Sequence, residues 1–338
     1  MIGRLLRRRE TSIALALVLV IVVATAKNDG FLLSTDGFRD LLLAPSLLVL
    51  LAVGQAAVII TRNVDLSVSS TLGLVAFATG SMFVAGLPVP VVIVLGIGLG
   101  AVLGAVNGVL VTSARVPSLV ITLGTLYAFR GITVIWAGSD RINAGDMPRS
   151  FLALGTAKWV GIPVLALVAL AVVVAVGVYL GYARSGREFY AIGSEPDAAV
   201  LSGLSVGRRV FFAFVLSGTL AGLAGVLFAA RYATIASNAG TGLELQAVAA
   251  AVIGGVAIFG GSGTVAGAAL GAVLLATIDR ALPILGIPDF WQQAVVGVLI
   301  LGAIVLDRVL ALRTARRLRS TGVAEIVRPL PPERVVAS

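Results

Sequence analysis

Apolar residues run along this chain in long blocks, and polar residues interrupt them only briefly. Most blocks hold about 18 residues or more, so a helix that rises about 1.5 Å per residue can cross a hydrocarbon layer about 30 Å thick. The pattern predicts an all-α, polytopic membrane protein with about ten spans. The expected spans cover residues 11–27, 41–61, 67–86, 89–113, 117–136, 161–182, 210–230, 243–259, 264–282 and 291–306.

Composition supports a membrane protein and excludes several kinds of chemistry. The chain is 59% apolar and 12% charged, with a mean hydropathy of +1.07, whereas soluble domains average about 45–50% apolar and about 25% charged. A soluble protein of this composition would have too little polar surface to stay in water. Cysteine and histidine are absent, which excludes disulfides, imidazole proton relays and metal sites built on these residues. We predict no metal site.

The first apolar segment has two interpretations. It follows a cluster of arginines that includes Arg4 and Arg9, and it ends in Ala24-Thr25-Ala26, which matches the A-x-A cleavage site of a signal peptide. We interpret the segment as an uncleaved first helix, with a cleaved signal peptide as the alternative.

Basic residues flank the apolar segments and form no stripe, so the net charge of +9 indicates membrane topology and no nucleic-acid partner. With the amino terminus placed in the cytoplasm, seventeen of the 25 Lys and Arg residues fall on inside segments, seven fall outside and Arg130 falls within a span. This is the positive-inside distribution, with both termini cytoplasmic. The predicted parts are a cytoplasmic terminus over 1–10, a transmembrane domain over 11–306 with a cytoplasmic loop over 183–209, and a basic cytoplasmic tail over 307–338.

Glycine recurs at four-residue spacing in two of the predicted helices. Small residues at this spacing form one smooth face that lets two backbones approach closely in lipid; the general abundance of glycine in membrane helices is the alternative. The glycines are Gly96, Gly100, Gly104 and Gly108 in one helix and Gly263, Gly267 and Gly271 around the other. These helices occupy matching places if spans 2–5 and 7–10 are repeats of opposite orientation, so we hypothesise an inverted repeat with the solute path near its interface.

The cytoplasmic loop 183–209 contains signals for a short helix. Ser194 and Asp197 have the spacing of a capping box, and Pro196 suits a first helical turn. Gly203 and Gly207 can end the helix. The pattern predicts a helix of about two turns, too short to span a membrane, that offers small and apolar residues to a cytoplasmic partner. A solvated connector is the alternative.

The chain lacks the phosphate-binding loop of ATPases. That loop ends in Gly-Lys-Ser/Thr, and the only lysines, Lys27 and Lys158, each follow an alanine. We therefore expect no catalytic residues and no cofactor bound by this chain. If its transport is driven by ATP, the nucleotide and Mg²⁺ bind another polypeptide.

Polar residues within the spans are candidates for a solute path, because polar groups at membrane depth are costly. No carboxylate lies clearly at the centre of a span, which argues against proton- or sodium-coupled transport. Amides, hydroxyls and an aromatic ring suit a hydroxylated solute, while hydrogen bonding between helices is the alternative for each residue. The candidates are Gln55, Asn107, Thr122, Thr125, Arg130, Trp136 and Gln246.

Four groups of residues follow one another over roughly residues 50–306. They are Gly54-Gln55 with Val58-Ile59-Ile60-Thr61 and Val64-Asp65-Leu66-Ser67; Val116-Pro117-Ser118 with Leu123-Gly124-Thr125 and Arg130-Gly131; Gly186-Arg187 with Ala191-Ile192-Gly193, Ala198-Ala199 and Ser202-Gly203-Leu204; and Gly254-Gly255 with Gly260-Gly261-Ser262-Gly263-Thr264. Together they resemble the signatures of ribose-type ABC importer permeases. The order of the four makes the resemblance specific.

The resemblance implies a permease of the bacterial inner membrane that pairs with a second permease copy or homologue. It would receive solute from an extracytoplasmic binding protein and dock a tandem nucleotide-binding ATPase through a helix at 195–204. The residues implied in ATPase coupling are Gly193, Glu195, Asp197, Ala198, Ala199, Ser202 and Gly203. The family carries ribose, xylose, galactose, arabinose, rhamnose and furanone-type signalling sugars.

The chain departs from the family pattern in two places. Glu195 stands where the family usually has asparagine, and Arg62-Asn63 replaces a usual glycine pair. The predicted function is an alternating-access permease for a monosaccharide or sugar-like solute. A permease for a signalling sugar or nucleoside, an ion-coupled secondary carrier and a membrane-embedded enzyme are the alternatives.

Overall fold

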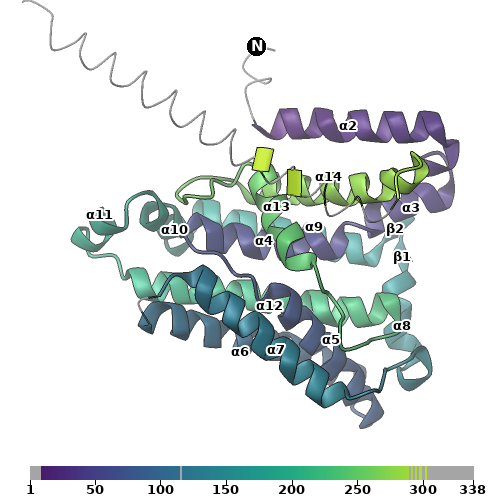
Figure 1. Ribbon diagram of the computed structural model, residues 1–338, viewed down its shortest axis with the longest axis horizontal. Helices are drawn as coiled ribbons and strands as arrows, with labels where there is room; N and C mark the ends of the chain where they lie inside the picture. The colour runs from purple at the N-terminus through teal and green to yellow at the C-terminus, as the bar shows by residue number, and fades with distance from the viewer. Residues whose placement is uncertain are drawn as a thin grey trace, which may run out of the picture.

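The computed structural model describes residues 9–114, 116–288 and six later positions (291, 294, 297, 298, 301 and 302), and within these residues the chain is almost entirely helical (Figure 1). The longer helices are α2 (Arg9–Lys27), α4 (Ser46–Ile60), α5 (Val68–Val84), α6 (Val89–Ser113), α7 (Ser118–Ala137), α9 (Val164–Tyr182), α12 (Val206–Tyr232) and α14 (Val265–Ile284). The shorter ones are α3 (Thr35–Leu43), α8 (Arg149–Thr156), α10 (Arg184–Ser194), α11 (Pro196–Leu201) and α13 (Leu243–Ile253), with 3-10 turns η1 (Asp29–Phe31) and η2 (Ala144–Asp146). Strands β1 (Lys158–Trp159) and β2 (Ile162–Pro163) form an antiparallel hairpin.

The centre of the molecule is the pair of helices α4 and α12, which contact each other. Every residue of α4 is buried, as expected for a helix that is apolar on all sides. On one side α12 packs against α5 and α6, and on the other α4 packs against α13 and α14 (Figure 1). Helix α2 lies along the outer side of α14, and α9 covers α4.

The predicted membrane fold is confirmed. Seven helical segments within the described residues are long and apolar enough to cross a membrane; they are Glu10–Lys27, Thr35–Ile60, Val89–Ser113, Ser118–Ala137, Val164–Tyr182, Val206–Tyr232 and Val265–Ile284. Two further predicted spans are shorter apolar helices, α5 and α13. The tenth, 291–306, lies outside the described residues except for isolated positions.

Helix α13 shows where the prediction from apolar runs was wrong. We predicted a span over 243–259, but the helix ends at Ile253, because Gly254 and Gly255 turn the chain and Gly255 has φ +91°. Its 11 residues reach about 16 Å, roughly half of a hydrocarbon layer. The segment is therefore a broken helix, a feature that transporters use near their solute path.

The four glycines spaced along α6 face α12. A Cβ atom added at Gly100 would lie 2.4 Å from the Gly218 carbonyl oxygen, and one at Gly104 would lie 2.4 Å from the Phe214 carbonyl oxygen. At Gly96 the Cβ would meet Val226, and at Gly108 it would meet Phe211. The two backbones are thus in direct contact, which requires glycine at the crossing.

The second glycine series lies against α13. A Cβ at Gly267 would come within 2.2 Å of the Gly254 carbonyl oxygen, and one at Gly271 within 2.1 Å of the Ala250 carbonyl oxygen. Gly263 lies in the connection before α14, at φ +135°. The two series therefore pack against different helices.

If spans 2–5 and 7–10 form an inverted repeat, each helix contact should have a counterpart in which the two halves are exchanged. Helix α6 packs against α12 and α14 against α4, while α5 packs against α12 and α13 against α4. The exchange relates span two to span seven, span three to span eight and span four to span nine. These pairings support the inverted repeat, which stays a prediction.

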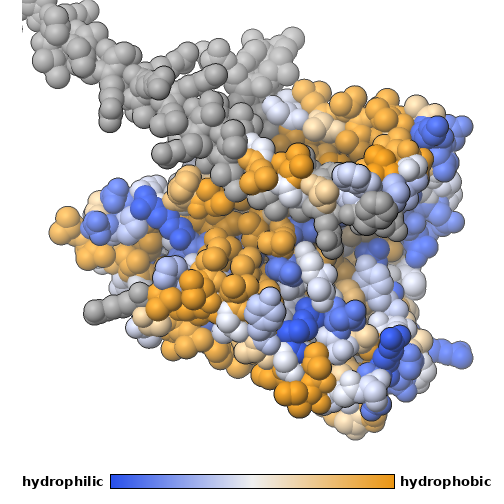
Figure 2. Space-filling view, viewed as in Figure 1, coloured by the Kyte–Doolittle hydropathy of each residue, from blue (hydrophilic) through white to orange (hydrophobic). Residues whose placement is uncertain are grey.

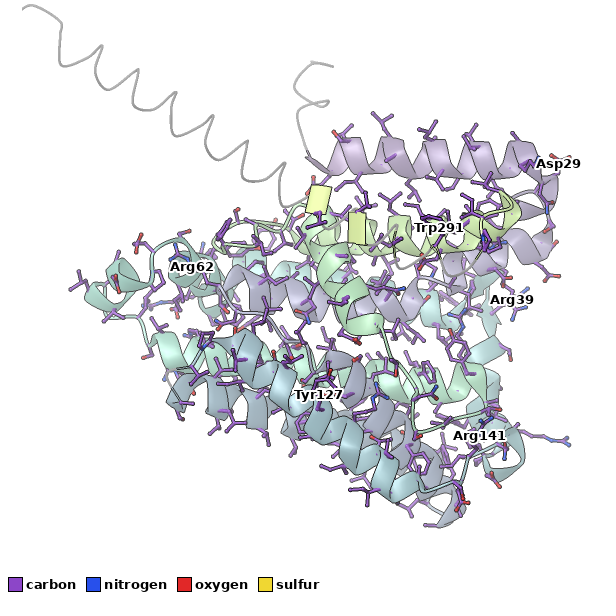
Figure 3. All side chains as sticks on the ribbon, in the orientation of Figure 1. Asp29, Arg39, Arg62, Tyr127, Arg141 and Trp291 are labelled. Carbon is purple, nitrogen blue, oxygen red and sulfur yellow. The ribbon has the colours of Figure 1, made fainter. Side chains whose placement is uncertain are left out.

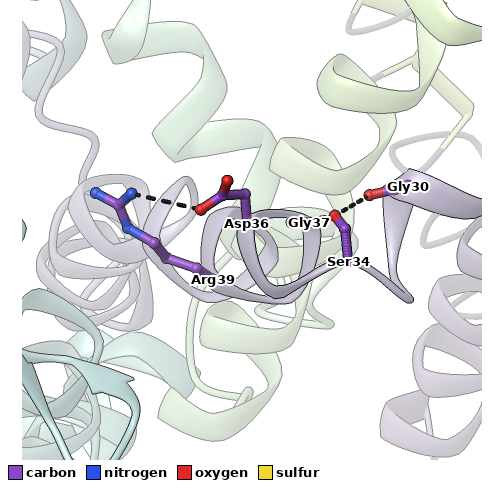
Figure 4. A network of polar contacts seen from close by, with 5 residues as sticks. All are labelled: Gly30, Ser34, Asp36, Gly37 and Arg39. Atoms are coloured by element: carbon purple, nitrogen blue, oxygen red, sulfur yellow. Dashed lines mark hydrogen bonds and ion pairs between the residues drawn. The ribbon is translucent and has the colours of Figure 1, made fainter.

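Hydrophilic residues gather toward the two ends of the long axis, and apolar side chains cover much of the surface between them (Figure 2). Arg62 lies beside α10 at one end, whereas Asp29, Arg39 and Arg141 lie at the other (Figure 3). We call these the α11 end and the α3 end. At the α3 end, Ser34 caps α3 by accepting a hydrogen bond from the Gly37 N–H and donates to the Gly30 carbonyl, beside an Asp36–Arg39 ion pair (Figure 4).

Candidate functional site

The predicted coupling segment 183–209 forms a projection at the α11 end, built from α10 and α11 (Figure 1). Helix α10 was not predicted. Its buried Phe189 and Ile192 anchor it against the bundle. Glu188 on α10 forms an ion pair with Arg209 on α12. Within this pair Arg209 Nε donates a hydrogen bond to the Glu188 carboxylate, which holds the pKa of that carboxyl below its ordinary value. The projection is therefore fixed to the membrane helices and does not hang free.

Helix α11 begins differently from the capping-box prediction, which was wrong. Its N-cap is Glu195, and Ser194 is the last residue of α10, where its hydroxyl donates to the Tyr190 carbonyl (2.9 Å). Pro196 occupies the first turn as predicted, and Gly203 follows the helix with φ +78°. The glycine is suited to this left-handed turn because it lacks a Cβ atom.

The surface of α11 is apolar at its tip, and the two residues that make it so, Val200 and Leu201, were not among those implied in ATPase coupling. Leu201 is 90% exposed and Val200 60% exposed, whereas Ala199 is only 5% exposed and packs inward. Exposed apolar side chains on a short projection outside the apolar helices are suited to a contact with another protein. A leucine at the end of a predicted docking helix was the available signal.

The other residues implied in coupling surround this tip. Glu195, Asp197, Ala198, Ser202 and Gly203 are exposed, and Gly193 is buried at the end of α10. Beside them lies a cavity of about 500 Å³ whose lining includes three arginines, Arg184, Arg208 and Arg209. An apolar tip beside a basic cavity is suited to a partner with an apolar groove and an acidic rim.

Two of the predicted path residues belong to a buried polar network between α4, α5, α6 and α12. Asp65 is 1% exposed and accepts hydrogen bonds from the Ser67 hydroxyl (2.7 Å) and the Ser217 hydroxyl (3.0 Å). The Asn107 amide donates to Ser67 Oγ (2.6 Å), and the Gln55 amide donates to the Asp65 carbonyl. Gln55 and Asn107 therefore hold the turn between α4 and α5 in place.

We expect Asp65→Ala to destabilise the protein more than any single change in the exposed acids. It removes a side chain that accepts two hydroxyl hydrogen bonds, and a buried polar group that loses its partner costs about 1–3 kcal/mol. Thermal unfolding of the purified chain in detergent measures the loss. Asp36→Ala is the control, since Asp36 is 85% exposed and should change stability by less than about 0.5 kcal/mol. Equal unfolding temperatures for the two variants would contradict the role of the network.

Three further path candidates lie along α7, and two of them, Thr122 and Arg130, bind connections between helices. Thr122 Oγ1 donates to the Val64 carbonyl (3.1 Å), and Thr125 Oγ1 donates to the Thr122 carbonyl (3.3 Å). Arg130 Nη1 donates to the carbonyls of Ser237 (3.1 Å) and Ala239 (2.6 Å), which lie between α12 and α13. Helix α7 thus secures two connections that follow the central helices α4 and α12.

The last two candidates line separate cavities. Trp136, 50% exposed, stacks edge-on against Phe77 and lines a cavity of about 360 Å³ with Asp140 and Asp146. Gln246 lines a cavity of about 280 Å³ between α4, α12, α13 and α14, and its amide lies 3.4 Å from the carboxylate of Asp279. The structure therefore does not bring the seven candidates into one site.

The Gln246 cavity combines the groups that a small hydroxylated solute needs. Tyr232 supplies an aromatic ring, Gln246 an amide and Asp279 a carboxylate, while Leu47 and Leu48 form an apolar wall. Arg231 and Arg280 also line it, and each donates to a backbone carbonyl, of Leu43 and Gly37 respectively. We name this space the α13 cavity.

Comparison with known proteins identifies the family. Residues 38–304 match the family described as "Branched-chain amino acid transport system / permease component". The chain is 38% identical over 303 residues to the autoinducer 2 import system permease protein LsrC of Enterobacter sp. (strain 638), covering 90% of this chain and 88% of that protein. It is 39% identical over 317 residues to the LsrC protein of Klebsiella pneumoniae, covering 94% and 91%.

The LsrC protein of Salmonella typhimurium is 39% identical over 286 residues, covering 85% of this chain and 82% of that protein. No solved structure matches the chain. The predicted resemblance to ABC importer permeases is thereby confirmed, together with the multi-pass location in the inner membrane. A permease of this kind works with a binding protein and an ATPase. The chain belongs to the family of transport-system permease components, as the membrane-spanning subunit of an ABC importer.

Proposed function

We propose that this permease imports autoinducer 2 or a closely similar small sugar-like solute. One observation carries the proposal: the similarity to autoinducer 2 import permeases extends over nine-tenths of the chain. Transport proceeds by alternating access, because ligand and ATP each stabilise one of two states of the path. A permease for ribose-class monosaccharides is the broader form of the same proposal.

We assign one partner protein to each end of the molecule. We place the α11 end in the cytoplasm, where the apolar tip of α11 docks a tandem ATPase that binds ATP and Mg²⁺. The α3 end then faces the solute-binding protein, and both termini lie inside. A second copy or homologue of the chain completes the path. The excess of arginine and lysine on the inside segments supports this orientation.

A branched-chain amino acid is the second candidate solute, because the description of the family names it. A zwitterion needs a free positive and a free negative group in the same site. In the α13 cavity both arginines already donate to backbone carbonyls, and Asp279 lies beside the Gln246 amide. The cavity lining thus holds groups of both charges, so the preference for autoinducer 2 rests on the similarity to its import permeases.

Uptake by the reconstituted transporter tests the proposal. The chain is co-purified with its ATPase, placed in proteoliposomes with its binding protein, and supplied with labelled autoinducer 2, ribose or leucine. We expect ATP-dependent uptake of autoinducer 2 above that of ribose and no uptake of leucine. Leucine uptake would support the second candidate. Uptake driven by an ion gradient without ATP would overturn the proposal.

We expect Gln246→Leu to weaken solute transport without stopping it. The change removes an amide from the α13 cavity, and one lost hydrogen bond of about 1.4 kcal/mol raises the apparent KM about tenfold. Initial uptake rates over a range of solute concentrations measure it. Leu245→Ala is the control, since Leu245 is 53% exposed and does not line the cavity. An unchanged KM in Gln246→Leu would remove the cavity from the path.

A further inference from the structure

Arg62 lies in the turn after α4, and its side chain joins this turn to the end of α10. Its backbone has φ +64°, a left-handed conformation that is strained for any residue with a Cβ atom. Its guanidinium donates from Nε to the Gly193 carbonyl and from Nη2 to the Ser194 carbonyl. These carbonyls belong to the last residues of α10, where helix carbonyls lack partners within the helix. Arg62 therefore caps α10 from another part of the chain.

A third segment meets the same point. The Gly261 N–H donates to the Ile60 carbonyl (2.9 Å), and a Cβ atom at Gly260 would lie 2.5 Å from Arg62 Cγ. A Cβ atom at Gly193 would lie 1.7 Å from the Ile60 carbonyl oxygen. Three segments thus touch through their backbones and the Arg62 side chain. We call this contact the cytoplasmic junction. It consists of Ile60 to Arg62, Gly193, Ser194, Gly260 and Gly261.

The junction connects α11 to α4 and to the segment between α13 and α14. Ile60 ends α4, Ser194 ends α10 just before α11, and Gly260 and Gly261 lie between α13 and α14. The hydroxyl of Tyr190 on α10 also donates to the Gly263 carbonyl (3.2 Å). Figure 3 shows Arg62 beside α10, away from the α3 end. A displacement of α11 therefore reaches α4 and the connection before α14 through these contacts, beside the Glu188–Arg209 link to α12.

We propose that Arg62 is a positioning residue that transmits movement of α11 to α4 and to the α13–α14 connection. The inference rests on the proposed docking of an ATPase on α11. Glycine would occupy a left-handed position without strain, so the arginine is explained by what its side chain does. Its planar guanidinium reaches two carbonyls at once, which a lysine ammonium on a flexible stem does less well.

Arg62→Gly tests the inference, because it relieves the backbone strain and removes the guanidinium. In proteoliposomes with the ATPase and the binding protein, we expect solute taken up per ATP hydrolysed to fall at least about fivefold, the lower limit of usual coupling between sites. Arg62→Lys should restore part of the ratio. Val160→Gly is the matched control, since Val160 also has positive φ (+51°) but lies 83% exposed at the tip of the β1–β2 hairpin.

A second measurement uses the purified chain alone. The chain has no cysteine, so Ser202→Cys places a single spin label at the end of α11. We expect the label to become more mobile when Arg62→Gly is added and to stay unchanged when Val160→Gly is added. This readout needs no partner, so it remains valid if Arg62→Gly weakens assembly.

The outcomes separate this inference from the proposed function. If the unaltered transporter shows no ATP-dependent uptake, the proposed function fails, whatever Arg62 does. If the unaltered transporter takes up solute and Arg62→Gly keeps the same uptake per ATP and the same label mobility, the role of Arg62 is overturned and the proposed function stands. A lower unfolding temperature with an unchanged ratio would reduce Arg62 to a structural cap and would also overturn the inference.

Discussion

Replacement of Leu201 by glutamate is expected to abolish ATP-driven uptake while the chain still inserts and folds. Leu201 is 90% exposed on α11, so the change removes no internal packing. Burial of a leucine in a partner contributes about 1.5–3 kcal/mol, and an unpaired carboxylate forced into the same contact costs several kcal/mol more. Together these effects reduce binding of the ATPase by more than about a thousandfold. Co-purification of the ATPase and uptake in proteoliposomes measure the loss.

Leu201→Met is the control for this prediction, because it keeps an apolar side chain of similar volume. Its uptake should stay close to that of the unaltered chain. Thermal unfolding of the Leu201→Glu chain alone should also be unchanged, because the side chain contacts little of its own protein. Normal uptake by Leu201→Glu would remove the tip of α11 from the docking surface.

The coupling segment shows how far sequence reasoning reaches at a surface. The motifs located the segment, and Pro196 and Gly203 correctly marked a short helix between them. They did not reveal which face of the helix points outward. Ala199 was a candidate for the contact, yet it is 5% exposed, and the exposed apolar residues are Val200 and Leu201. The orientation of so short a helix depends on α10, which the sequence did not predict as a helix.

The polar residues of the spans show a similar limit. Composition and periodicity identified Gln55 and Asn107 as costly groups within apolar helices, which is a correct physical statement. Their partners, Asp65 and Ser67, lie in the turn after α4. Whether a buried amide binds a solute or a neighbouring backbone depends on contacts between helices, and no local pattern contains them. The break of α13 at Gly254 was missed because an apolar run continues past the glycine pair.

The four-residue spacing of glycines says more about helix packing than the polar residues say about a solute site, because the spacing concerns one face of one helix. Replacement of Gly100 by valine is expected to prevent stable folding of the chain. The Cβ atom alone would lie 2.4 Å from the Gly218 carbonyl oxygen and 2.5 Å from Gly222 Cα. Overpacking costs about 1–3 kcal/mol when side chains can move aside, and here the opposing atoms are backbone atoms that cannot. The amount of monodisperse protein extracted in detergent, and its unfolding temperature, measure the effect.

Gly98 provides the matched control on the same helix. It lies two residues from Gly100, and among the described residues a Cβ atom added there would meet no atom of another helix within 4 Å. Gly98→Val carries the same change in helix propensity and in side-chain volume, so any difference between the two variants comes from the contact with α12. Gly100→Val as stable as Gly98→Val would mean that α6 and α12 do not cross at Gly100. Because α12 also contacts α4 and α5, a wider spacing there would shift the centre of the bundle.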